Sequence, residues 1–244
     1  MIIDGKEISF LSEREPTALP WGTMNVDIVI EATGIFASYE KSKMHLDAGA
    51  KRVIISGPVK DDPTAAGVNG ATVLMGVNDA TLATCNITSN ASCTTNATSP
   101  LVDILKKSIG IEKAILNTIH AYTSTQSLVD GPSKDFRKGR AAAQNIIPTS
   151  TGAAIATTKA HTELDGRFDG ISVRVPVAVG SLVDVTFIAS RNTSVEEVNK
   201  ILKESSSTPE WRNLFAVTEE PLVSSDIIGA QFAVINEVFI KNKH

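Results

Sequence analysis

A strand, a helix and a second strand follow one another early in the chain, and this order restricts the possible fold more than any other feature. The apolar run Val26–Ala32 precedes a helical stretch over about 38–48, and a second apolar run occupies Lys51–Ser56. Two neighbouring strands joined by a crossover helix run parallel. We therefore expect an α/β fold with a parallel sheet, to which Thr72–Gly76 and Asn86–Ser89 add strands.

Small polar residues stand where the first two strands end. Thr33 and Gly34 follow the first strand, and Ser56 closes the second. Ligands of open α/β sheets bind outside the carboxyl ends of the strands, so these three residues are candidates for binding a dinucleotide. The alternative is that they only form the turns that end the strands.

The pattern changes near Cys93, where a helix is expected to begin. Pro100 falls inside that helix and should kink or restart it. Further on, strand-like runs such as Ile171–Val175 and Leu182–Ala189 predominate, and Ser194–Glu197 has the capping-box pattern of another helix start. These features predict a second domain with a mixed sheet.

Cys93 follows an apolar run that ends in polar residues, at the expected start of a helix. Unpaired backbone N–H groups and the positive end of the helix dipole favour a thiolate there, and the thiolate is the nucleophilic form. The strand-like run Ala114–Ile119 leads to His120, which a strand–helix–strand arrangement can bring next to Cys93. Cys93 and His120 are therefore candidates for a nucleophile and its base, and the alternative for Cys93 is a buried structural thiol.

The composition excludes several classes of function. The 244 residues are 42% hydrophobic and 20% charged with a net charge of −4, which is typical of a globular protein that binds neither nucleic acid nor a membrane. The sequence contains no signal peptide, no apolar run of membrane-spanning length, and no Cys-x-x-Cys or His-x-x-x-His pattern for a metal. Cys85 and Cys93 are the two cysteines, and a reactive thiol suits a reducing compartment. We expect a cytoplasmic protein whose partner is a small molecule.

Several blocks of the sequence resemble the glyceraldehyde-3-phosphate dehydrogenase family. The octapeptide Ser89–Asn96 is similar to the family's active-site signature, and the tetrapeptide His120-Ala-Tyr-Thr is similar to the presentation of its histidine. More blocks that resemble the family follow in its usual order: Gly131–Arg140, Asn145–Ala154, Gly170–Pro176 and Ser194–Asn199. The resemblance implies the remainder of a Rossmann-type parallel-sheet domain, followed by an α+β catalytic domain with a mixed, largely antiparallel sheet.

The resemblance also implies a reaction. Glyceraldehyde 3-phosphate would be oxidised to 1,3-bisphosphoglycerate with NAD and inorganic phosphate, as in glycolysis, through a thiohemiacetal and a thioester on Cys93. His120 would act as the acid–base group. Pro132 stands where NAD-preferring members of the family commonly have proline, which favours NAD over NADP, and the family implies a homotetramer.

Residue by residue, the resemblance implies three binding sets. Thr123 and Arg174 belong to the side of the substrate phosphate. The set implied for the attacking phosphate comprises Ser92, Thr94, Thr151 and Gly152. The set implied for NAD comprises Thr33, Gly34 and Ser56. The alternative for each hydroxyl is a local cap or turn hydrogen bond, and for Arg174 a salt bridge to an acidic neighbour.

One family feature is absent from the sequence. No two of the 16 glycines stand two residues apart, so the dinucleotide fingerprint Gly-x-Gly-x-x-Gly does not occur. The resemblance also implies a further strand and a long terminal helix after the segment Glu219–Gly229, and the sequence stops before that helix. We therefore expect a chain truncated at both ends, with an incomplete dinucleotide-binding domain over 1–91 and a catalytic domain over 92–244 whose carboxyl-terminal end is incomplete. By itself such a chain should show no measurable NAD-dependent turnover. An assembly module without activity and a coenzyme-independent thiol hydrolase are the alternatives.

Overall fold

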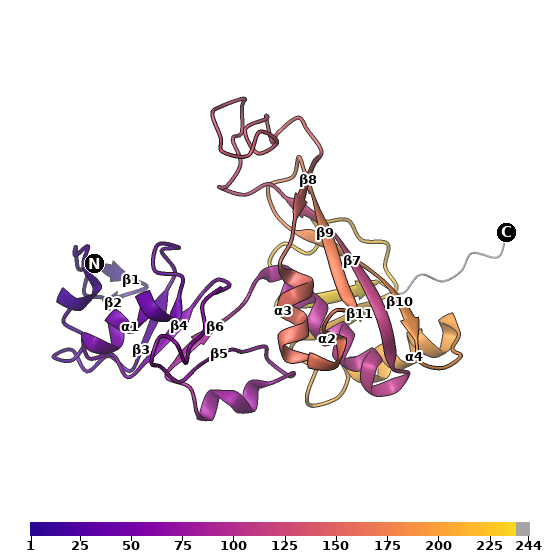
Figure 1. The fold of residues 1–244 in the computed structure, drawn as a ribbon, viewed down its shortest axis with the longest axis horizontal. Coiled ribbons are helices and arrows are strands. Elements are labelled where there is room, and N and C mark those ends of the chain that lie inside the picture. Colours follow the sequence, from indigo (N-terminus) through magenta and orange to yellow (C-terminus); the bar gives the residue numbers. More distant parts are fainter. Residues whose placement is uncertain (238–244) are drawn as a thin grey trace. The chain divides into compact units, whose positions relative to one another are not determined.

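The computed structural model describes residues 1–237 of the chain (Figure 1). The chain forms two compact units. The amino-terminal unit comprises Met1–Val73 and Ala80–Ala91, and the carboxyl-terminal unit comprises Leu74–Asp79 and the chain from Ser92 onward. The fold and the site are therefore described unit by unit.

A parallel sheet forms the centre of the amino-terminal unit. Its strands are β3 (Ile28–Glu31), β4 (Arg52–Ile55), β6 (Ile87–Ser89) and β5 (Gly70–Thr72), in that order across the sheet, and every neighbouring pair is parallel. Helix α1 (Tyr39–Asp47) connects β3 to β4. The strand–helix–strand prediction and the parallel sheet are confirmed.

Local hydrogen bonds explain where α1 begins. The hydroxyl of Ser38 accepts a hydrogen bond from the N–H of Lys41 at 3.1 Å, and the carboxylate of Asp61 accepts from the first two N–H groups of the helix. These acceptors satisfy donors that a helix start leaves unpaired. The ring of Tyr39 is then buried with Val53, Ile87 and other apolar side chains in the core of this unit.

The predicted strand over Thr72–Gly76 is wrong in its extent, because β5 ends at Thr72. Beyond it the chain turns: the N–H of Leu74 donates to the side chain of Asn78 at 2.7 Å, and Gly76 has a φ of +77°. A Cβ at Gly76 would lie 2.7 Å from the ring of Trp211. Packing against Trp211 therefore needs glycine here and draws Leu74–Asp79 into the carboxyl-terminal unit.

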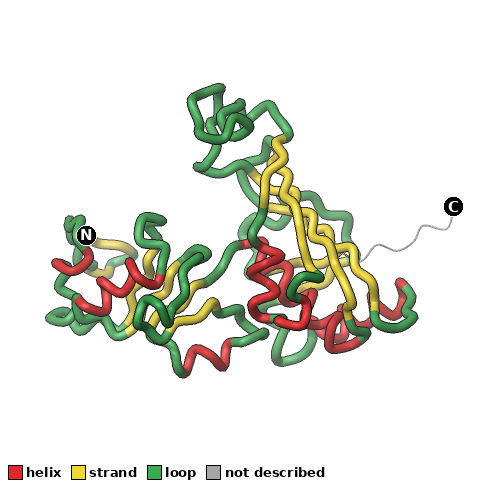
Figure 2. The backbone as a smooth tube through the Cα atoms, in the orientation of Figure 1, coloured by secondary structure: helices red, strands yellow, loops and turns green. Residues whose placement is uncertain are grey.

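The carboxyl-terminal unit contains a four-stranded mixed sheet, as predicted. Its strands, in spatial order, are β10 (Ser181–Ala189), β7 (Ile111–Ala121), β9 (Phe168–Val175) and β8 (Ile147–Ser150). β7 pairs antiparallel with β10 and parallel with β9, and β8 pairs antiparallel with β9. The long connection from β7 to β8 contains no helix or strand (Figure 2).

Helices pack against this sheet and enclose the core of the unit. α2 (Cys93–Ser108) contacts β7 and β10, and α3 (Ala153–Ala160) contacts β9 (Figure 1). Leu116 of β7 and Val102 of α2 are both fully buried in this core. The shorter elements of the two units complete the description: β1 (Ile2–Ile3), β2 (Lys6–Glu7), η1 (Pro16–Ala18), η2 (Asp79–Ala83), η3 (Thr162–Leu164), β11 (Phe215–Thr218) and β12 (Val234–Glu237).

Pro100 was predicted to kink or restart the helix, and of these two outcomes the restart does not occur, because α2 is one helix through Pro100. Proline removes one backbone donor from a helix interior, which costs about 3 kcal/mol. Pro100 is itself buried, and Val102, Ile104 and Leu105 bury an apolar face in the next turns. The burial of this face offsets the lost hydrogen bond.

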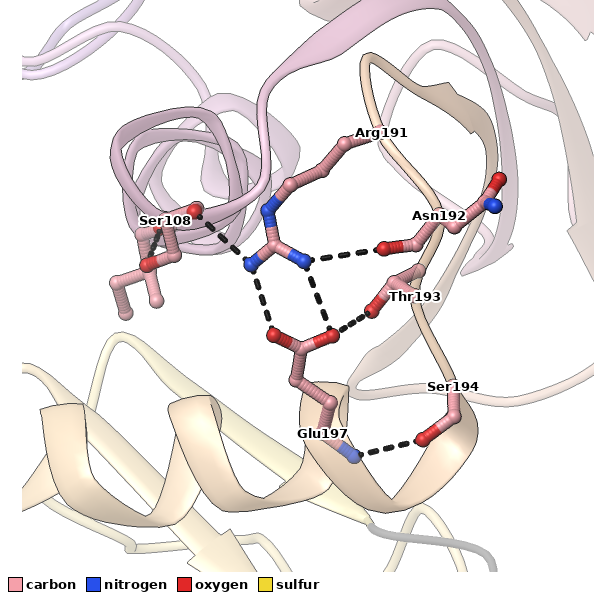
Figure 3. Close-up of polar contacts among 7 residues, drawn as sticks. Ser108, Arg191, Asn192, Thr193, Ser194 and Glu197 are labelled. Carbon is pink, nitrogen blue, oxygen red and sulfur yellow. Dashed lines mark hydrogen bonds and ion pairs between the residues drawn. The ribbon is translucent and has the colours of Figure 1, made fainter.

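The capping box at the start of α4 (Val195–Ser206) forms only in part (Figure 3). The hydroxyl of Ser194 accepts from the N–H of Glu197 at 3.2 Å, as the pattern predicts. The Glu197 carboxylate instead accepts two hydrogen bonds from the guanidinium of Arg191, at 2.8 and 3.1 Å, and one from Thr193. Arg191 also donates to the carbonyl of Ser108 and so links this turn to the end of α2.

Candidate active site

Cys93 is the first residue of α2 and its side chain is exposed. Ser92 is the N-cap: its hydroxyl accepts from the N–H of Thr95 at 3.1 Å. The preceding residue, Ala91, is buried and has a φ of +56°, a conformation that non-glycine residues seldom adopt. The backbone thus turns sharply before the helix, and the thiol stands at the positive end of the helix dipole.

His120 lies near the end of β7, and its ring contacts Cys93. The distance from the Cys93 Sγ to the His120 Nε2 is 3.2 Å. The other ring nitrogen, Nδ1, lies 2.7 Å from the carbonyl oxygen of Ala121. A thiol, an imidazole and an orienting carbonyl therefore stand in line, which is the arrangement of a nucleophile activated by a base.

Arg174 occupies the β9 position that pairs with His120 in the parallel register. Its Nη1 lies 2.5 Å from the His120 Nδ1 and 3.0 Å from the Ala121 carbonyl oxygen. Among the described residues, no carboxylate forms an ion pair with Arg174. The structure therefore gives no support to the salt bridge that was the alternative for this arginine.

These contacts shift the pKa values of the pair in opposite directions. The hydrogen bond from His120 lowers the pKa of the Cys93 thiol, and the N–H and hydroxyl of Thr94 lower it further. The same contact with Cys93 raises the pKa of His120, with a smaller contribution from the Ala121 carbonyl. Partial burial opposes both shifts, and the charge of Arg174 opposes the second. Both directions favour a thiolate beside an imidazolium.

Other predicted phosphate ligands lie in local hydrogen bonds. The Ser92 hydroxyl also bonds to the hydroxyl of Thr95, at 2.8 Å, and the Thr151 hydroxyl accepts from the N–H of Ala153. Gly152 is the N-cap residue of α3 and is itself exposed, whereas Ala153 and Ala154 at the start of the helix are buried. In the described part of the chain, no hydrogen bond joins these groups to Cys93 or His120.

Thr123 lies just beyond β7, three residues after His120. Its hydroxyl shares a hydrogen bond of 2.8 Å with that of Thr125, and its N–H donates to the side chain of Gln126. Among residues 1–237, no hydrogen bond joins Thr123 to Arg174, the other residue predicted for the substrate phosphate. Thr94, predicted for the attacking phosphate, is buried and helps to lower the pKa of the Cys93 thiol.

The three residues predicted to bind the coenzyme lie at one edge of the parallel sheet in the amino-terminal unit. Thr33 and Gly34 follow β3, and the N–H of Ser56 donates to the carbonyl of Glu31 at 2.9 Å. Gly34 has a φ of +75°, and an added Cβ would meet no atom within 4 Å. All three residues are exposed, so a ligand can approach the backbone of the turn and the Ser56 hydroxyl.

Sequence reasoning missed a buried polar group beneath that edge. The carboxylate of Glu31 accepts from the N–H and hydroxyl of Thr33 and contacts the Nε2 of His45 at 3.1 Å. The indole of Trp21 donates to the other ring nitrogen of His45. Glu31 and His45 therefore hold the Thr33 turn in place. An acidic residue within an apolar strand was the only sequence signal for this group.

Within residues 1–237, no group of three or more histidine, cysteine or acidic side chains is arranged to hold a metal ion. In the same range, no helix combines the length and the apolar character that crossing a membrane needs.

Comparisons with known proteins match this chain to one family. The family model described as "Glyceraldehyde 3-phosphate dehydrogenase, C-terminal domain" matches residues 92–241, and the model of the NAD binding domain matches residues 1–39. "Glyceraldehyde-3-phosphate dehydrogenase 2" of Streptomyces avermitilis is 46% identical over 229 residues, which are 93% of this chain and 66% of that protein. The corresponding enzyme of Borreliella burgdorferi is 44% identical over 94% of this chain and 68% of its own length. "Glyceraldehyde-3-phosphate dehydrogenase B" of Aspergillus oryzae is 42% identical over 239 residues, which are 98% of this chain and 69% of that protein. The chain thus spans about two thirds of the length of these curated relatives.

Proposed function

The chain belongs to the glyceraldehyde 3-phosphate dehydrogenase family, and we propose that its carboxyl-terminal unit carries the covalent chemistry of a phosphorylating aldehyde dehydrogenase. The single observation that carries the proposal is the 3.2 Å contact between the Cys93 thiol, at a helix start, and the ring of His120. The substrate in this proposal is glyceraldehyde 3-phosphate, the products include 1,3-bisphosphoglycerate, and the reaction is a step of glycolysis.

In the first step, the Cys93 thiolate attacks the aldehyde carbon and forms a C–S bond. The resulting thiohemiacetal carries its negative charge on oxygen, next to the imidazolium of His120. His120 transfers its Nε2 proton to this oxygen, which becomes the hydroxyl of the thiohemiacetal. It would take this proton back as the carbon loses a hydride, which the bound coenzyme would accept, and becomes the carbonyl carbon of the thioester. The Ala121 carbonyl, 2.7 Å from the Nδ1, keeps the ring oriented throughout.

In the second step, an oxygen of inorganic phosphate attacks the thioester carbon. The C–S bond breaks, the acyl phosphate leaves, and the Cys93 thiolate is regenerated. The start of α3 at the exposed Gly152 suits the attacking anion, together with the hydroxyls of Thr151 and Ser92. Arg174 and Thr123 suit the phosphate of the substrate.

The amino-terminal unit fits a coenzyme at the edge where Thr33, Gly34 and Ser56 lie. NAD is the coenzyme of the family domain that residues 1–39 match. When bound, NAD supplies a hydride acceptor. The hydroxyl of Thr33 already bonds to Glu31 and to the N–H of Ile35, so the turn offers backbone groups and the Ser56 hydroxyl for this contact. The proposal also includes a cytoplasmic homotetramer.

The assignment of Cys93 is tested by alkylation of the folded chain with iodoacetamide between pH 5 and 9, followed by peptide mapping of the two thiols. Cys93 is exposed and its pKa is lowered, whereas Cys85 is buried. We expect Cys93 to be labelled first, and still to be labelled at pH values where an ordinary thiol is protonated.

Two variants complete the test. His120→Gln removes the imidazole, so labelling of Cys93 should shift to higher pH in this variant. Cys93→Ser should abolish the fast labelling and leave only the slow reaction of Cys85. Equal labelling rates of the two cysteines near pH 7 in the unsubstituted chain would contradict the proposal.

A further inference from the structure

Arg174 and His120 form a pair across two parallel strands. The register places them opposite one another on β9 and β7, and both side chains are half-buried on the face where Cys93 also lies. Groups of like charge directly opposite one another in a sheet are destabilising. Arginine remains protonated, so the state of His120 decides whether this pair holds one positive charge or two.

The protonation state of His120 decides whether one donor or two donors share the Ala121 carbonyl oxygen. When the Nδ1 carries no proton, it accepts from Arg174, at the observed 2.5 Å. When the ring is an imidazolium, its Nδ1–H has the Ala121 carbonyl oxygen at 2.7 Å as its acceptor. Arg174 then keeps only its 3.0 Å bond to the same oxygen, and the two cations compete for one acceptor.

The charged groups around His120 are few. Cys93 approaches from α2, and Arg174 from β9. On β10 the residue opposite His120 is Ser181, which carries no charge. In the described part of the chain, no carboxylate pairs with Arg174, and the anion that favours its charged form is the Cys93 thiolate.

We propose that Arg174 couples anion binding to the chemistry of the thiol: an anion that binds Arg174 raises the proton affinity of His120 and thereby favours the imidazolium that the reaction needs. Arg174 is in this respect a positioning residue, because it acts through His120. This inference rests on the proposed function. It gives the substrate phosphate a part in the chemical step in addition to its part in binding.

The electrostatics of the pair agree with this geometry. Contact with Cys93 raises the pKa of His120, and the charge of Arg174 lowers it. A bound dianion would neutralise that charge and draw the guanidinium away from the Nδ1. The Ala121 carbonyl would then be free to accept from the ring alone.

The test measures the pKa of His120 by NMR in a chain with ¹⁵N-labelled histidine. His120→Gln identifies the His120 signal among the four histidines. Titrations are run in sodium sulfate and in sodium chloride of equal ionic strength, since sulfate remains a dianion across the pH range. We expect sulfate to raise the pKa of His120 by roughly one unit relative to chloride.

Two variants separate the charge of Arg174 from its packing. Arg174→Met keeps a long side chain without charge, and the pKa of His120 should rise in chloride and no longer respond to sulfate. Arg174→Lys keeps the charge, so the response to sulfate should persist. His45 and His161 serve as internal controls within each folded variant.

Two results would overturn the inference: a pKa of His120 that is the same in Arg174→Met as in the unsubstituted chain, or one that does not respond to sulfate when Arg174 is present. The NMR titration does not depend on thiol reactivity. If Cys93 is not labelled preferentially while His120 responds to sulfate, the proposed function fails and the coupling holds. If Cys93 is labelled and His120 does not respond, the coupling alone fails.

Discussion

Replacing Ser92 by alanine should destabilise the carboxyl-terminal unit more than the loss of an ordinary helix cap. The hydroxyl of Ser92 accepts from the N–H of Thr95 at 3.1 Å and bonds to the hydroxyl of Thr95 at 2.8 Å. Thr95 has an exposed fraction of 0%, so water cannot replace the lost partner. Both bonds disappear in Ser92→Ala.

The magnitude follows from these two losses. Removal of an N-cap side chain costs about 1 kcal/mol of the free energy of unfolding. A buried hydroxyl left without this partner costs about 1–3 kcal/mol more. The expected total is about 2–4 kcal/mol. Ser92→Thr keeps a hydroxyl at the cap and should cost less than about 1 kcal/mol.

The assay is urea unfolding followed by tryptophan fluorescence. Trp211 is 3% exposed and lies in the same unit, so a Trp21→Phe background leaves one reporter of that unit. Ser194→Ala is the matched control, because Ser194 caps α4 through a single hydrogen bond at an exposed position. That variant should lose about 1 kcal/mol. If Ser92→Ala loses no more than Ser194→Ala, the bond between the Ser92 and Thr95 hydroxyls adds nothing and the reasoning is refuted.

Two further predictions concern the same unit. Leu116→Ala should lower the free energy of unfolding, measured in urea, by about 2–5 kcal/mol, because Leu116 is fully buried. Leu182 is 59% exposed on the neighbouring strand, so Leu182→Ala should change this free energy by less than about 0.5 kcal/mol. Similar losses in the two variants would mean that the core is misplaced. Burial, and then the charge of Lys106, lower the pKa of His161 below 6.5, so the unfolded chain binds a proton that the folded chain resists. Stability should fall as the pH drops below about 6.5, and His161→Gln should flatten this part of the stability curve. An unchanged curve would assign the acid sensitivity to other groups.

Much of the fold was predictable because its signals are local. The apolar runs and the helix between them predicted the parallel pairing of β3 and β4, which the structure confirms. A polar cap before Cys93 predicted the start of α2, and an apolar strand predicted β7 with His120 near its end. Caps, periodicity and chain direction depend on residues close in sequence, so they can be inferred without the fold.

Other features depended on contacts between distant segments. The strand after Thr72 ends early because Trp211 requires a glycine turn at Gly76. A tertiary partner competed there with the local pattern and determined the outcome.

The candidate site likewise combines features that were predictable from the sequence with features that depend on the fold. Residue type and local position were enough to identify the residues that could supply a thiol, an imidazole and an arginine. The contact of Arg174 with His120, 54 residues away in the chain, and the carbonyl of Ala121 that both share could be found only from the folded structure. The physical reason is register: a shift of one residue between β7 and β9 would turn Arg174 to the opposite face of the sheet, and only the packing of the whole unit selects the register.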